Sequence, residues 1–414
     1  MTWREESIVS QRLEFVSLAI ADGANVARLC RRFGISRQTG YKWIERFRSG
    51  GAGAIDNRSS RPHRSPVRTS AKTEASVLTL RAAHPAWGGR KLRARLLALG
   101  VRDVPVPSTI TEILRRHDQL IEPRSSQHPP FTRFERARPN ELWQMDFKGH
   151  VPLHVGGRCH PLTMIDDHSR YAIALRACGN ERGETVQREL IATFRRYGLP
   201  ERMLCDNGPP WGVPQGMGRH TRLTVWLLRL GVQISHGRPR HPQTQGKEER
   251  FHRTLNAELL TRQELKSMTH AQREFDAWRD VYNLERPSEA IGLNVPASRY
   301  TPSERAYPEK LPLIEFSPDD TVRGVSHDGS FRYLNSKWFI GEAFAHERVG
   351  VRLDHDGMLE ARYGPHVVGR FNPEHPPTAR VPLHPVYDRQ GRCRQSGLAA
   401  LALPGDSGEP TKCQ

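Results

Sequence analysis

The stretch from His241 to Leu255 reads HPQTQGKEERFHRTL. It starts with a turn-forming proline, continues as a polar loop that ends at Gly246, and then takes the pattern of a helix. That helix opens with two adjacent glutamates, Glu248 and Glu249, inside a run of Lys, Arg and His. This arrangement raises the question of whether one of the two glutamates is a metal ligand.

The helical periodicity separates the two glutamates. At about 100° per residue, Phe251, Leu255 and Leu259 form the apolar face of this helix. Glu248 lies roughly 60° from Phe251, whereas Glu249 lies about 160° away. Glu249 is therefore expected outside the core, while Glu248 remains a possible ligand if the helix is rotated.

Two other acids stand within or directly after predicted strands. Asp146 interrupts the apolar strand LWQMDFKG, and Asp206 directly follows the strand RMLC. Asp206 precedes Asn-Gly, so it can also be an ordinary turn former. Asp146 loses hydration in the middle of a strand and needs a partner, such as a shared cation. A third carboxylate from the helix after Gly246 would complete a ligand set suited to Mg²⁺ or Mn²⁺.

The length and charge of the chain indicate several domains and a polyanionic partner. The 414 residues are enough for two to four compact domains. Lys and Arg number 63 against 45 Asp and Glu, a formal net charge of +18. Residues 1–125 hold 23 basic and 11 acidic side chains, so twelve of these charges lie in the first third. Nucleic acid is the leading partner, although high charge alone also suits a solvated surface.

A helix-turn-helix pattern occupies the first of these segments. An apolar helical face precedes the turn FGIS, where Gly34 allows a left-handed turn and Ser36 can cap the next helix. That helix, SRQTGYKWIERF, presents Arg37, Gln38 and Lys42 near its start, as a helix that reads the major groove would. An ordinary helical hairpin is the alternative interpretation.

A second helix-turn-helix-like unit follows a linker rich in Gly, Ser and Pro. The linker carries Arg58, Arg61 and Arg64, which can follow the DNA backbone or simply solvate a tether. In the second unit Ser108 is predicted to cap a helix. The predicted core residues are Leu92, Leu96, Leu99, Ile110, Ile113 and Leu114.

From Leu142 onward the pattern becomes strand-like, with an amphipathic helix between strands, and it predicts an α/β sandwich with a mixed sheet. Farther on, short strands with turn signals at His327-Asp328-Gly329 and His355-Asp356-Gly357 predict two hairpins and a small β-barrel. The predicted domains are residues 1–50 and 71–120 (helix-turn-helix), linkers 51–70 and 121–138, the α/β core 139–300, the barrel 313–372 and a mostly flexible tail 373–414.

Several other classes of site are not supported. The six cysteines form no C-x-x-C pair, and they are expected to be reduced and structural. Strand alternation separates His150, His154, Cys159 and His160, which argues against a zinc site. No run of 18 apolar residues and no signal-peptide block indicates a membrane segment. No phosphate-loop or dinucleotide motif implies a nucleotide cofactor.

Five ordered motifs carry a resemblance to a known family. NELWQMDFKG, LTMIDDHSRY, LCDNG, HPQTQGKEERFHRTL and YNLERPSEAIG, in this order, resemble the bacterial insertion-sequence transposases whose catalytic core is similar to retroviral integrase. The resemblance covers most of the chain and is most specific from Asn140 to about Tyr300. It implies a multidomain protein with N-terminal all-α helix-turn-helix units, a central α/β RNase H-like core and a C-terminal small β-barrel.

The resemblance also implies a D-D-E metal site at Asp146, Asp206 and Glu249. The family's glutamate stands three positions after the loop glycine, which selects Glu249 over Glu248. Two departures occur: 42 residues separate Asp206 from Glu249, more than is usual, and Ser288 stands where the motif YN..RPH has His. Neither departure removes a catalytic residue. Asp166 and Asp167 in MIDDHSRY resemble the family's structural hairpin.

The implied function is that of a DDE transposase, a polynucleotidyl transferase that uses Mg²⁺ or Mn²⁺. Two ions would clamp the attacking and leaving oxygens, first for cleavage at the element end and then for joining of the 3′-hydroxyl to target DNA. On the helix of Glu249, Lys247, Arg250 and Arg253 would hold the DNA backbone. The expected setting is the bacterial cytoplasm and nucleoid, with a dimer or tetramer on double-stranded DNA. The alternatives are a catalytically inactive DNA-binding regulator and a metal-dependent nuclease that only cuts.

Overall fold

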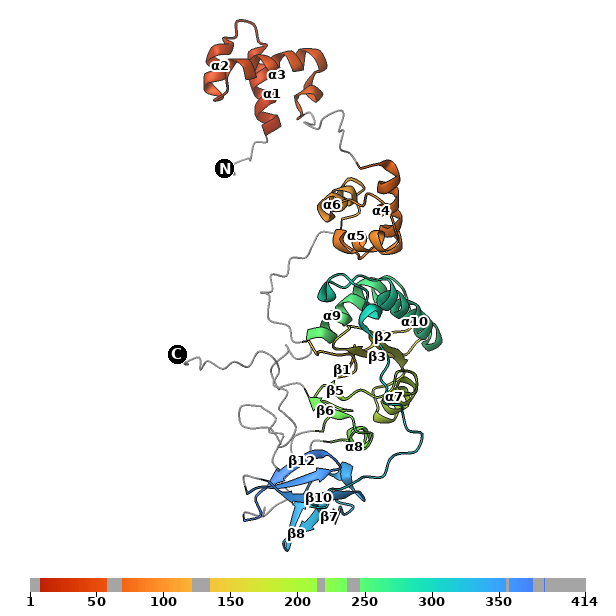
Figure 1. The fold of residues 1–414 in the computed structure, drawn as a ribbon. Coiled ribbons are helices and arrows are strands. Elements are labelled where there is room, and N and C mark those ends of the chain that lie inside the picture. The colour runs from red at the N-terminus through yellow and green to blue at the C-terminus, as the bar shows by residue number, and fades with distance from the viewer. Residues whose placement is uncertain are drawn as a thin grey trace. The chain divides into compact units, whose positions relative to one another are not determined.

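The computed structural model describes residues 8–57, 69–120, 135–213, 220–236, 246–354, 357–374 and 383. The chain divides into two compact units, Met1–Arg68 and Thr69–Gln414 (Figure 1). Within the described residues, no helix has both the length and the apolar character needed to cross a membrane. The predicted flexible tail, 373–414, lies almost entirely outside the described residues.

The first unit is a small bundle of three helices, α1 (Ile8–Ala19), α2 (Val26–Arg32) and α3 (Arg37–Gly50), followed by the 3₁₀ turn η1 (Ala52–Ile55). The two predicted signals between α2 and α3 are confirmed. Gly34 has a φ of 63°, and the Ser36 side chain accepts a hydrogen bond from the Thr39 amide. The core of the bundle comprises Phe15, Val16, Ala19, Cys30, Trp43, Ile44 and Ile55.

The second unit begins with three more helices, α4 (Ala71–Ala83), α5 (Gly89–Ala98) and α6 (Pro107–Arg116). Two details of the prediction are wrong. Leu99 is 56% exposed, because α5 ends before it. Ser108 does not cap α6, because Pro107 occupies the first helical turn and Val106 becomes the N-cap residue. The other predicted core positions are confirmed as buried: Leu92, Leu96, Ile110, Ile113 and Leu114.

A six-stranded mixed sheet forms the centre of the second unit. Its strands are β1 (Trp143–Phe147), β2 (Val151–Pro152), β3 (Arg158–Asp166), β4 (Ala172–Cys178), β5 (Arg202–Cys205) and β6 (Gln233–His236). Strand β3 pairs antiparallel with β1, β2 and β4. Strand β5 runs parallel to β1 on one side and to β6 on the other. The predicted mixed sheet is thus confirmed.

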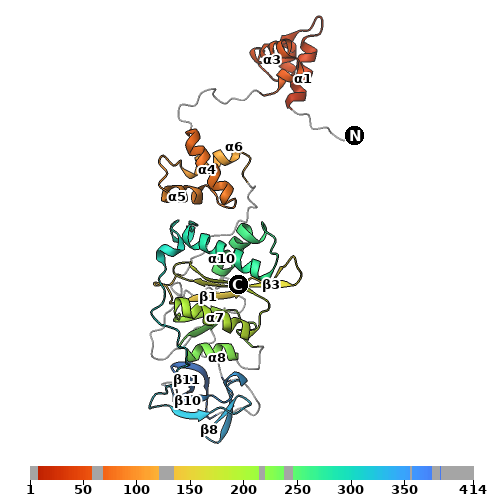
Figure 2. The same cartoon turned by 90° about the vertical axis from the view of Figure 1, so that its right-hand side faces the viewer.

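Helices cover both faces of this sheet (Figure 2). On one face α7 (Gly183–Tyr197) and α8 (Arg222–Arg229) pack against the side chains of Leu162 and Met164. On the other face lie α9 (Gly246–Leu255), the π-helical turn η3 (Asn256–Leu260) and α10 (Met268–Leu284). Two 3₁₀ turns follow, η4 (Glu289–Ile291) and η5 (Pro296–Arg299).

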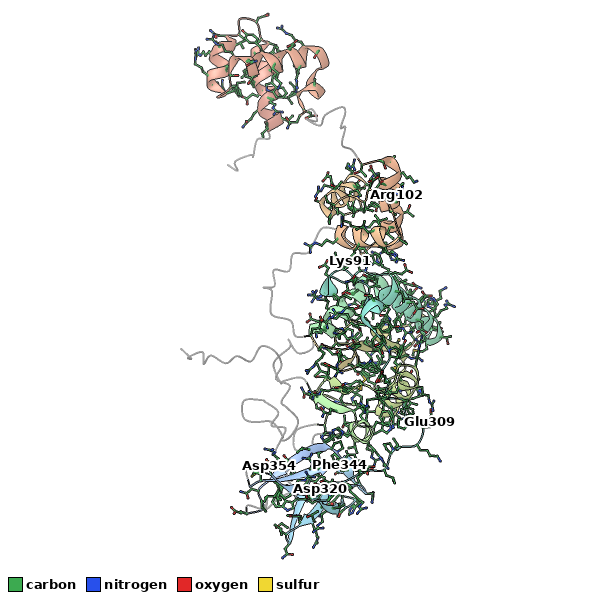
Figure 3. All side chains as sticks on the ribbon, viewed as in Figure 1. Lys91, Arg102, Glu309, Asp320, Phe344 and Asp354 are labelled. Atoms are coloured by element: carbon green, nitrogen blue, oxygen red, sulfur yellow. The ribbon has the colours of Figure 1, made fainter. Side chains whose placement is uncertain are left out.

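In the part of the chain that the structure describes, the C-terminal region forms two separate sheets, and the predicted closed β-barrel is not confirmed. A four-stranded antiparallel sheet has the order β12-β11-β10-β7, and β8 pairs separately with β9. The bounds are β7 (Thr321–Gly324), β8 (Ser330–Tyr333), β9 (Ser336–Phe339), η6 (Glu342–Phe344), β10 (Arg348–Leu353), β11 (Leu359–Tyr363) and β12 (His366–Phe371). Figure 3 labels Asp320, Phe344 and Asp354 in this region.

Strand β7 pairs with a different strand from the one that the sequence predicts. The turn at Gly329 was predicted to join a hairpin, but β7 pairs with β10 and not with β8. The short β8–β9 hairpin instead packs through aromatic side chains, with the Trp338 and Phe371 ring centroids 4.4 Å apart. The second predicted hairpin, β10–β11, is paired as expected, although residues 355 and 356 of its turn lie outside the described residues.

Helix α8 is shared between the central sheet and the C-terminal sheets. Leu223, Trp226 and Leu227 belong to the core beneath the central sheet. Val225 and Leu228, on the opposite side of the helix, pack into the core of the C-terminal sheets. The two parts of the unit are therefore joined through an apolar core on each side of one helix.

Candidate active site

Asp146 and Asp206 come from neighbouring parallel strands. Asp146 lies in β1, and Asp206 directly follows β5. Strands β1 and β5 pair with Trp143 opposite Met203 and Gln144 opposite Leu204. Continued for two residues, this register would bring Asp146 level with Asp206. The charge of Asp206 acts on Asp146, so the two carboxylates are near each other at the same end of the two parallel strands.

The environment of Asp146 disfavours its charge. Partial burial is the main cause, and the Asp206 and Glu181 carboxylates add repulsion, so the pKa of Asp146 rises to about 6. A hydrogen bond of 2.8 Å from the Phe147 amide and the nearby Lys148 act in the opposite direction. Two acids that repel each other at a strand edge form a site that a cation would stabilise.

Glu248 is buried on the inner side of α9, with 1% of its surface exposed. Its Oε2 atom lies 3.0 Å from the Thr163 hydroxyl and 3.7 Å from His252 Nε2. Burial, and secondarily the charge of Asp146, raises the pKa of Glu248 well above its ordinary value, while the bond to Thr163 opposes the rise. Its Oε1 atom has no hydrogen-bond partner among the described residues.

Glu249 lies on the outer side of the same helix. Its side chain is 68% exposed and accepts a hydrogen bond of 2.9 Å from Arg253 Nη2. This confirms the helical-face prediction, which placed Phe251 in the core and Glu249 outside it. The side chain of Glu249 is consequently directed to solvent and Arg253.

The predicted three-carboxylate cluster is not assembled in this structure. The charge of Asp206 acts on Asp146, and the charge of Asp146 in turn acts on Glu248. Across the residues that the structure describes, no group of three or more His, Cys, Asp or Glu side chains is arranged to hold a metal ion. The physical reason is that Glu249 is turned to solvent and paired with Arg253, while Glu248 lies inward.

The hairpin after β3 is held by buried acids. Asp166 accepts hydrogen bonds from the Asn140 amide and from Ser169. Asp167 accepts hydrogen bonds from Gln144 Nε2 and the Arg136 amide, and it is ion-paired with Lys247. Each acid therefore has structural partners, as the resemblance to a structural hairpin implies.

Lys247 was predicted to lie near the exposed side of α9, and that placement is wrong. Only 14% of its side chain is exposed, because its ammonium group turns inward to Asp167. Burial lowers the pKa of Lys247 to about 8, against the opposing charge of Asp167. Arg250 and Arg253, the other two basic residues predicted on this helix, are exposed.

The predicted DNA-reading residues lie on an exposed surface of the first unit. Arg37, Gln38 and Lys42 are all exposed in α3. The linker residues Arg58, Arg61 and Arg64 lie outside the described residues.

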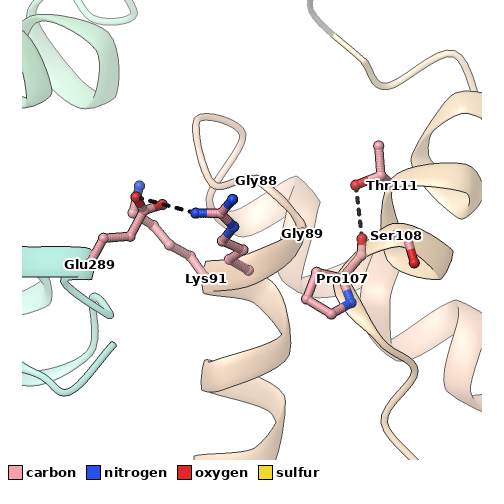
Figure 4. Close-up of a pocket in the computed structure, with 8 residues that line it drawn as sticks. Gly88, Gly89, Lys91, Pro107, Ser108, Thr111 and Glu289 are labelled. Carbon is pink, nitrogen blue, oxygen red and sulfur yellow. Dashed lines mark hydrogen bonds and ion pairs between the residues drawn. The ribbon is translucent and has the colours of Figure 1, made fainter. Parts of the chain in front are cut away.

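The second unit has two further polar features. His154 and His160 each pair with a glutamate, Glu264 and Glu181 respectively, at 2.8 Å. A pocket of about 450 Å³ lies at the starts of α5 and α6, near η4 (Figure 4). It shares no residue with the carboxylate cluster.

Comparison with known families identifies the domains to which parts of this chain are similar. Residues 136–242 and 230–296 match two families that are both described as integrase core domain. The chain contains an integrase core domain. Residues 11–63 match a helix-turn-helix domain and residues 39–114 a homeodomain-like domain. The integrase core thus follows helical domains of DNA-binding type.

Known proteins with similar sequences include insertion-element proteins. The IS407 31.7 kDa protein of Burkholderia multivorans is 28% identical over 168 residues, covering 41% of this chain and 57% of that protein. The IS476 39.2 kDa protein of Xanthomonas euvesicatoria is 28% identical, covering 39% of this chain and 44% of that protein. The chain therefore spans about half the length of these relatives. The Gag-Pol polyprotein of baboon endogenous virus is 26% identical over 51% of this chain and 12% of its own length.

Solved structures of retroviral integrase cores also align with the chain. The catalytic core of BIV integrase is 22% identical, with a TM-score of 0.30, over 38% of this chain and 92% of that one. The HTLV-2 integrase catalytic core in complex with magnesium is 17% identical, with a TM-score of 0.30, over 40% of this chain and 99% of that one.

The structure adds residues that sequence reasoning missed. Thr163 and His252 contact Glu248, and Glu181 acts on Asp146. One available signal was His252, which stands one helical turn after Glu248 and so shares its face. Another was Thr163, a polar residue in the middle of an apolar strand.

Proposed function

We propose that this chain is a DNA transposase that binds the ends of an insertion element, cleaves DNA there and joins the freed 3′ ends to target DNA. The observation that carries the proposal is that Asp146 in β1 and Asp206 after β5 come from neighbouring parallel strands and interact electrostatically, in a region that matches an integrase core domain. Neighbouring helix-turn-helix domains supply the DNA-binding parts that such a reaction requires.

The residues present fit a divalent cation. Asp146 and Asp206 offer hard oxygen ligands. Burial, and then the charge of Asp206, raises the pKa of Asp146, and a bound cation would favour the charged carboxylate. Proteins with an integrase core use divalent metals, and we propose Mg²⁺ or Mn²⁺, with two ions. When bound, such ions neutralise charge on the phosphate and lower the pKa of a bound water.

We propose Glu249 as the third ligand, with Asp146 and Asp206. Glu249 occupies the open side of α9, where DNA and ions can approach, whereas Glu248 is enclosed. To reach the two aspartates, Glu249 has to release Arg253, an exposed pair that costs little to break. Arg253 would then be free to contact a DNA phosphate, together with Arg250.

The remaining contacts follow from exposure and charge. Arg37, Gln38 and Lys42 on α3 would read bases of the element end, and the linker arginines Arg58, Arg61 and Arg64 would contact its backbone. Since the two ends of an element are joined in concert, the active form would be a dimer or tetramer. Its setting would be the nucleoid in the bacterial cytoplasm.

A strand-transfer assay tests this function. Labelled duplexes from the inverted repeats that flank the gene are incubated with plasmid target and Mg²⁺ or Mn²⁺. Wild-type protein is expected to nick and join the ends, whereas Asp146→Asn, Asp206→Asn and Glu249→Gln are expected to bind them without either reaction. Glu264→Gln, a change of another exposed glutamate, is the matched control.

The alternatives give different results in the same assay. Nicking without joining would indicate a metal-dependent nuclease. Binding without nicking or joining by the wild type would indicate a DNA-binding regulator, a reading that the outward direction of Glu249 favours. Inactivity of Glu248→Gln with an active Glu249→Gln would assign the third ligand to the buried glutamate.

A further inference from the structure

The hydroxyl group of Thr163 is the centre of a buried polar cluster behind the carboxylates. Thr163 Oγ1 lies 2.9 Å from the main-chain oxygen of Asp146, 3.0 Å from Glu248 Oε2 and 2.9 Å from His252 Nε2. Thr163, Glu248 and His252 are 0%, 1% and 9% exposed. The cluster therefore joins three elements of the integrase core, β1, β3 and α9.

The surroundings of this cluster are apolar. On α9 the inward neighbours are Phe251 and Leu255, which pack with Ile165 of β3. A glutamate in such a layer loses its hydration, and a single hydrogen bond offsets only part of that cost. An apolar side chain would fill the same layer without this penalty, so simple packing does not account for a glutamate here.

The hydrogen bonds of Thr163 connect the strand of Asp146 to helix α9. Thr163 stands directly opposite Asp146 in the β1–β3 register, so its hydrogen bond to the Asp146 carbonyl holds the strand of the first aspartate. Its contacts to Glu248 and His252 hold two successive turns of α9. Lys247, paired with Asp167, holds the start of the same helix. Rotation of α9 about its axis would break all of these contacts.

We propose that Glu248, Thr163 and His252 are positioning residues that fix the rotation of α9 and so the direction of Glu249 relative to Asp146 and Asp206. This inference rests on the proposed function, since it assigns Glu249 to the metal site. Glu248 does not itself contact metal or DNA; it acts through the helix that carries its neighbour.

The variants that test this proposal differ in the hydrogen bonds that their side chains can make. The Thr163 hydroxyl has one hydrogen, and the Asp146 carbonyl can only accept. Glutamine at position 248 has both a donor and an acceptor, so Glu248→Gln preserves the bond to Thr163. Thr163→Val removes this bond with little change in side-chain volume, and Glu248→Val removes it with a smaller side chain. Thr163→Ser keeps the hydroxyl group.

The experiment compares these four variants with wild type in three measurements. Mn²⁺ titration of the DNA-free protein by calorimetry gives metal affinity without any need for catalysis. Binding of the element end gives DNA affinity, and strand transfer gives the joining rate. Circular dichroism identifies variants that remain folded.

The valine variants are expected to bind DNA as wild type does, but to bind Mn²⁺ and to join ends roughly 10- to 100-fold less well, as is typical for loss of supporting contacts around metal ligands. Glu248→Gln and Thr163→Ser are expected to match wild type in all three measurements. A structural role alone would alter stability without this separation of metal affinity from DNA affinity.

Three outcomes would overturn the inference. Folded valine variants with wild-type Mn²⁺ affinity would show that the cluster does not position the site. Loss of Mn²⁺ binding in Glu248→Gln would make Glu248 a ligand. If the valine variants do not fold, failure of Thr163→Ser to retain wild-type Mn²⁺ affinity would count against the cluster. Wild-type protein that binds Mn²⁺ but never joins ends would refute the proposed function and leave the Mn²⁺ comparison to decide the inference.

Discussion

Lys247, the second residue of α9, is ion-paired with Asp167, a carboxylate with no exposed surface. The pair connects the start of the helix that carries both glutamates to the hairpin that follows β3. The side chain of Lys247, which the sequence pattern assigned to DNA contact, thus points into the interior of the integrase core.

Removing this lysine leaves a buried acid without its cation. Lys247→Met is expected to lower the free energy of unfolding by about 3 kcal/mol, the lower end for a broken buried pair, because Gln144 and the Arg136 amide still bind Asp167. Urea denaturation measures the change. Arg253→Met, which breaks the exposed pair on the same helix, is the control and is expected to cost less than about 1 kcal/mol. Equal costs for the two variants would contradict the assignment of a buried pair.

Glu248 is expected to make stability depend on pH. Its pKa is raised in the folded protein, so the unfolded chain releases this proton first as pH increases, and the stability present at low pH is lost above the ordinary glutamate range. Glu248→Gln removes this loss. The variant is therefore expected to gain stability over wild type as the pH rises above the ordinary glutamate range, by up to about 1.4 kcal/mol per pH unit. Denaturation curves for both proteins across this range measure the gain, and a constant difference would show that the carboxyl is charged throughout.

Asp146 and Asp206 are expected to destabilise the metal-free protein. For each unit by which the pKa of Asp146 is raised, the free energy of unfolding at neutral pH is lower by about 1.4 kcal/mol. Asp146→Asn should therefore raise the melting temperature without metal and remove the further increase that Mg²⁺ gives to wild type. Thermal melts with Mg²⁺ and with a chelator test both effects. A Mg²⁺-dependent increase that survives in Asp146→Asn would place the ion elsewhere.

Gly40 in α3 is expected to tolerate no larger residue. A Cβ atom at this position would lie 2.5 Å from Cys30 Sγ and 2.9 Å from Phe15 Cζ, both in the core of the first unit. Gly40→Ala should cost about 1–3 kcal/mol through overpacking, despite the higher helix propensity of alanine. The comparison is with Gly53→Ala, where no atom lies within 4 Å. Thermal denaturation of the two variants distinguishes close packing from a general effect of replacing glycine, which would affect both alike.

The features that could be predicted from sequence depend on local rules. The Ser36 cap, the buried faces of α5 and α6 and the opposite directions of Phe251 and Glu249 all follow from helical periodicity and end signals. Asp146 and Asp206 could be singled out because an acid within or directly after an apolar strand interrupts the apolar pattern. In these cases the controlling residues lie within a few positions of one another.

The features that were missed depend on residues far apart in the chain. Thr163 meets Glu248 across 85 positions, and no local pattern specifies that contact. The strands of the C-terminal region were recognised by their alternation, but their pairing was not, since alternation does not state which strand lies beside β7. The burial of Lys247 was missed for the same reason, because its partner Asp167 lies 80 positions away in the chain.

Helix α8 has a consequence for how the second unit unfolds. Its two apolar sides belong to two different hydrophobic cores, so neither core can lose its neighbour without exposing a row of aliphatic side chains to water. The integrase core and the C-terminal sheets should therefore melt in a single transition. A protein cut before residue 313 would present Val225 and Leu228 as an uncovered surface and would be prone to aggregate.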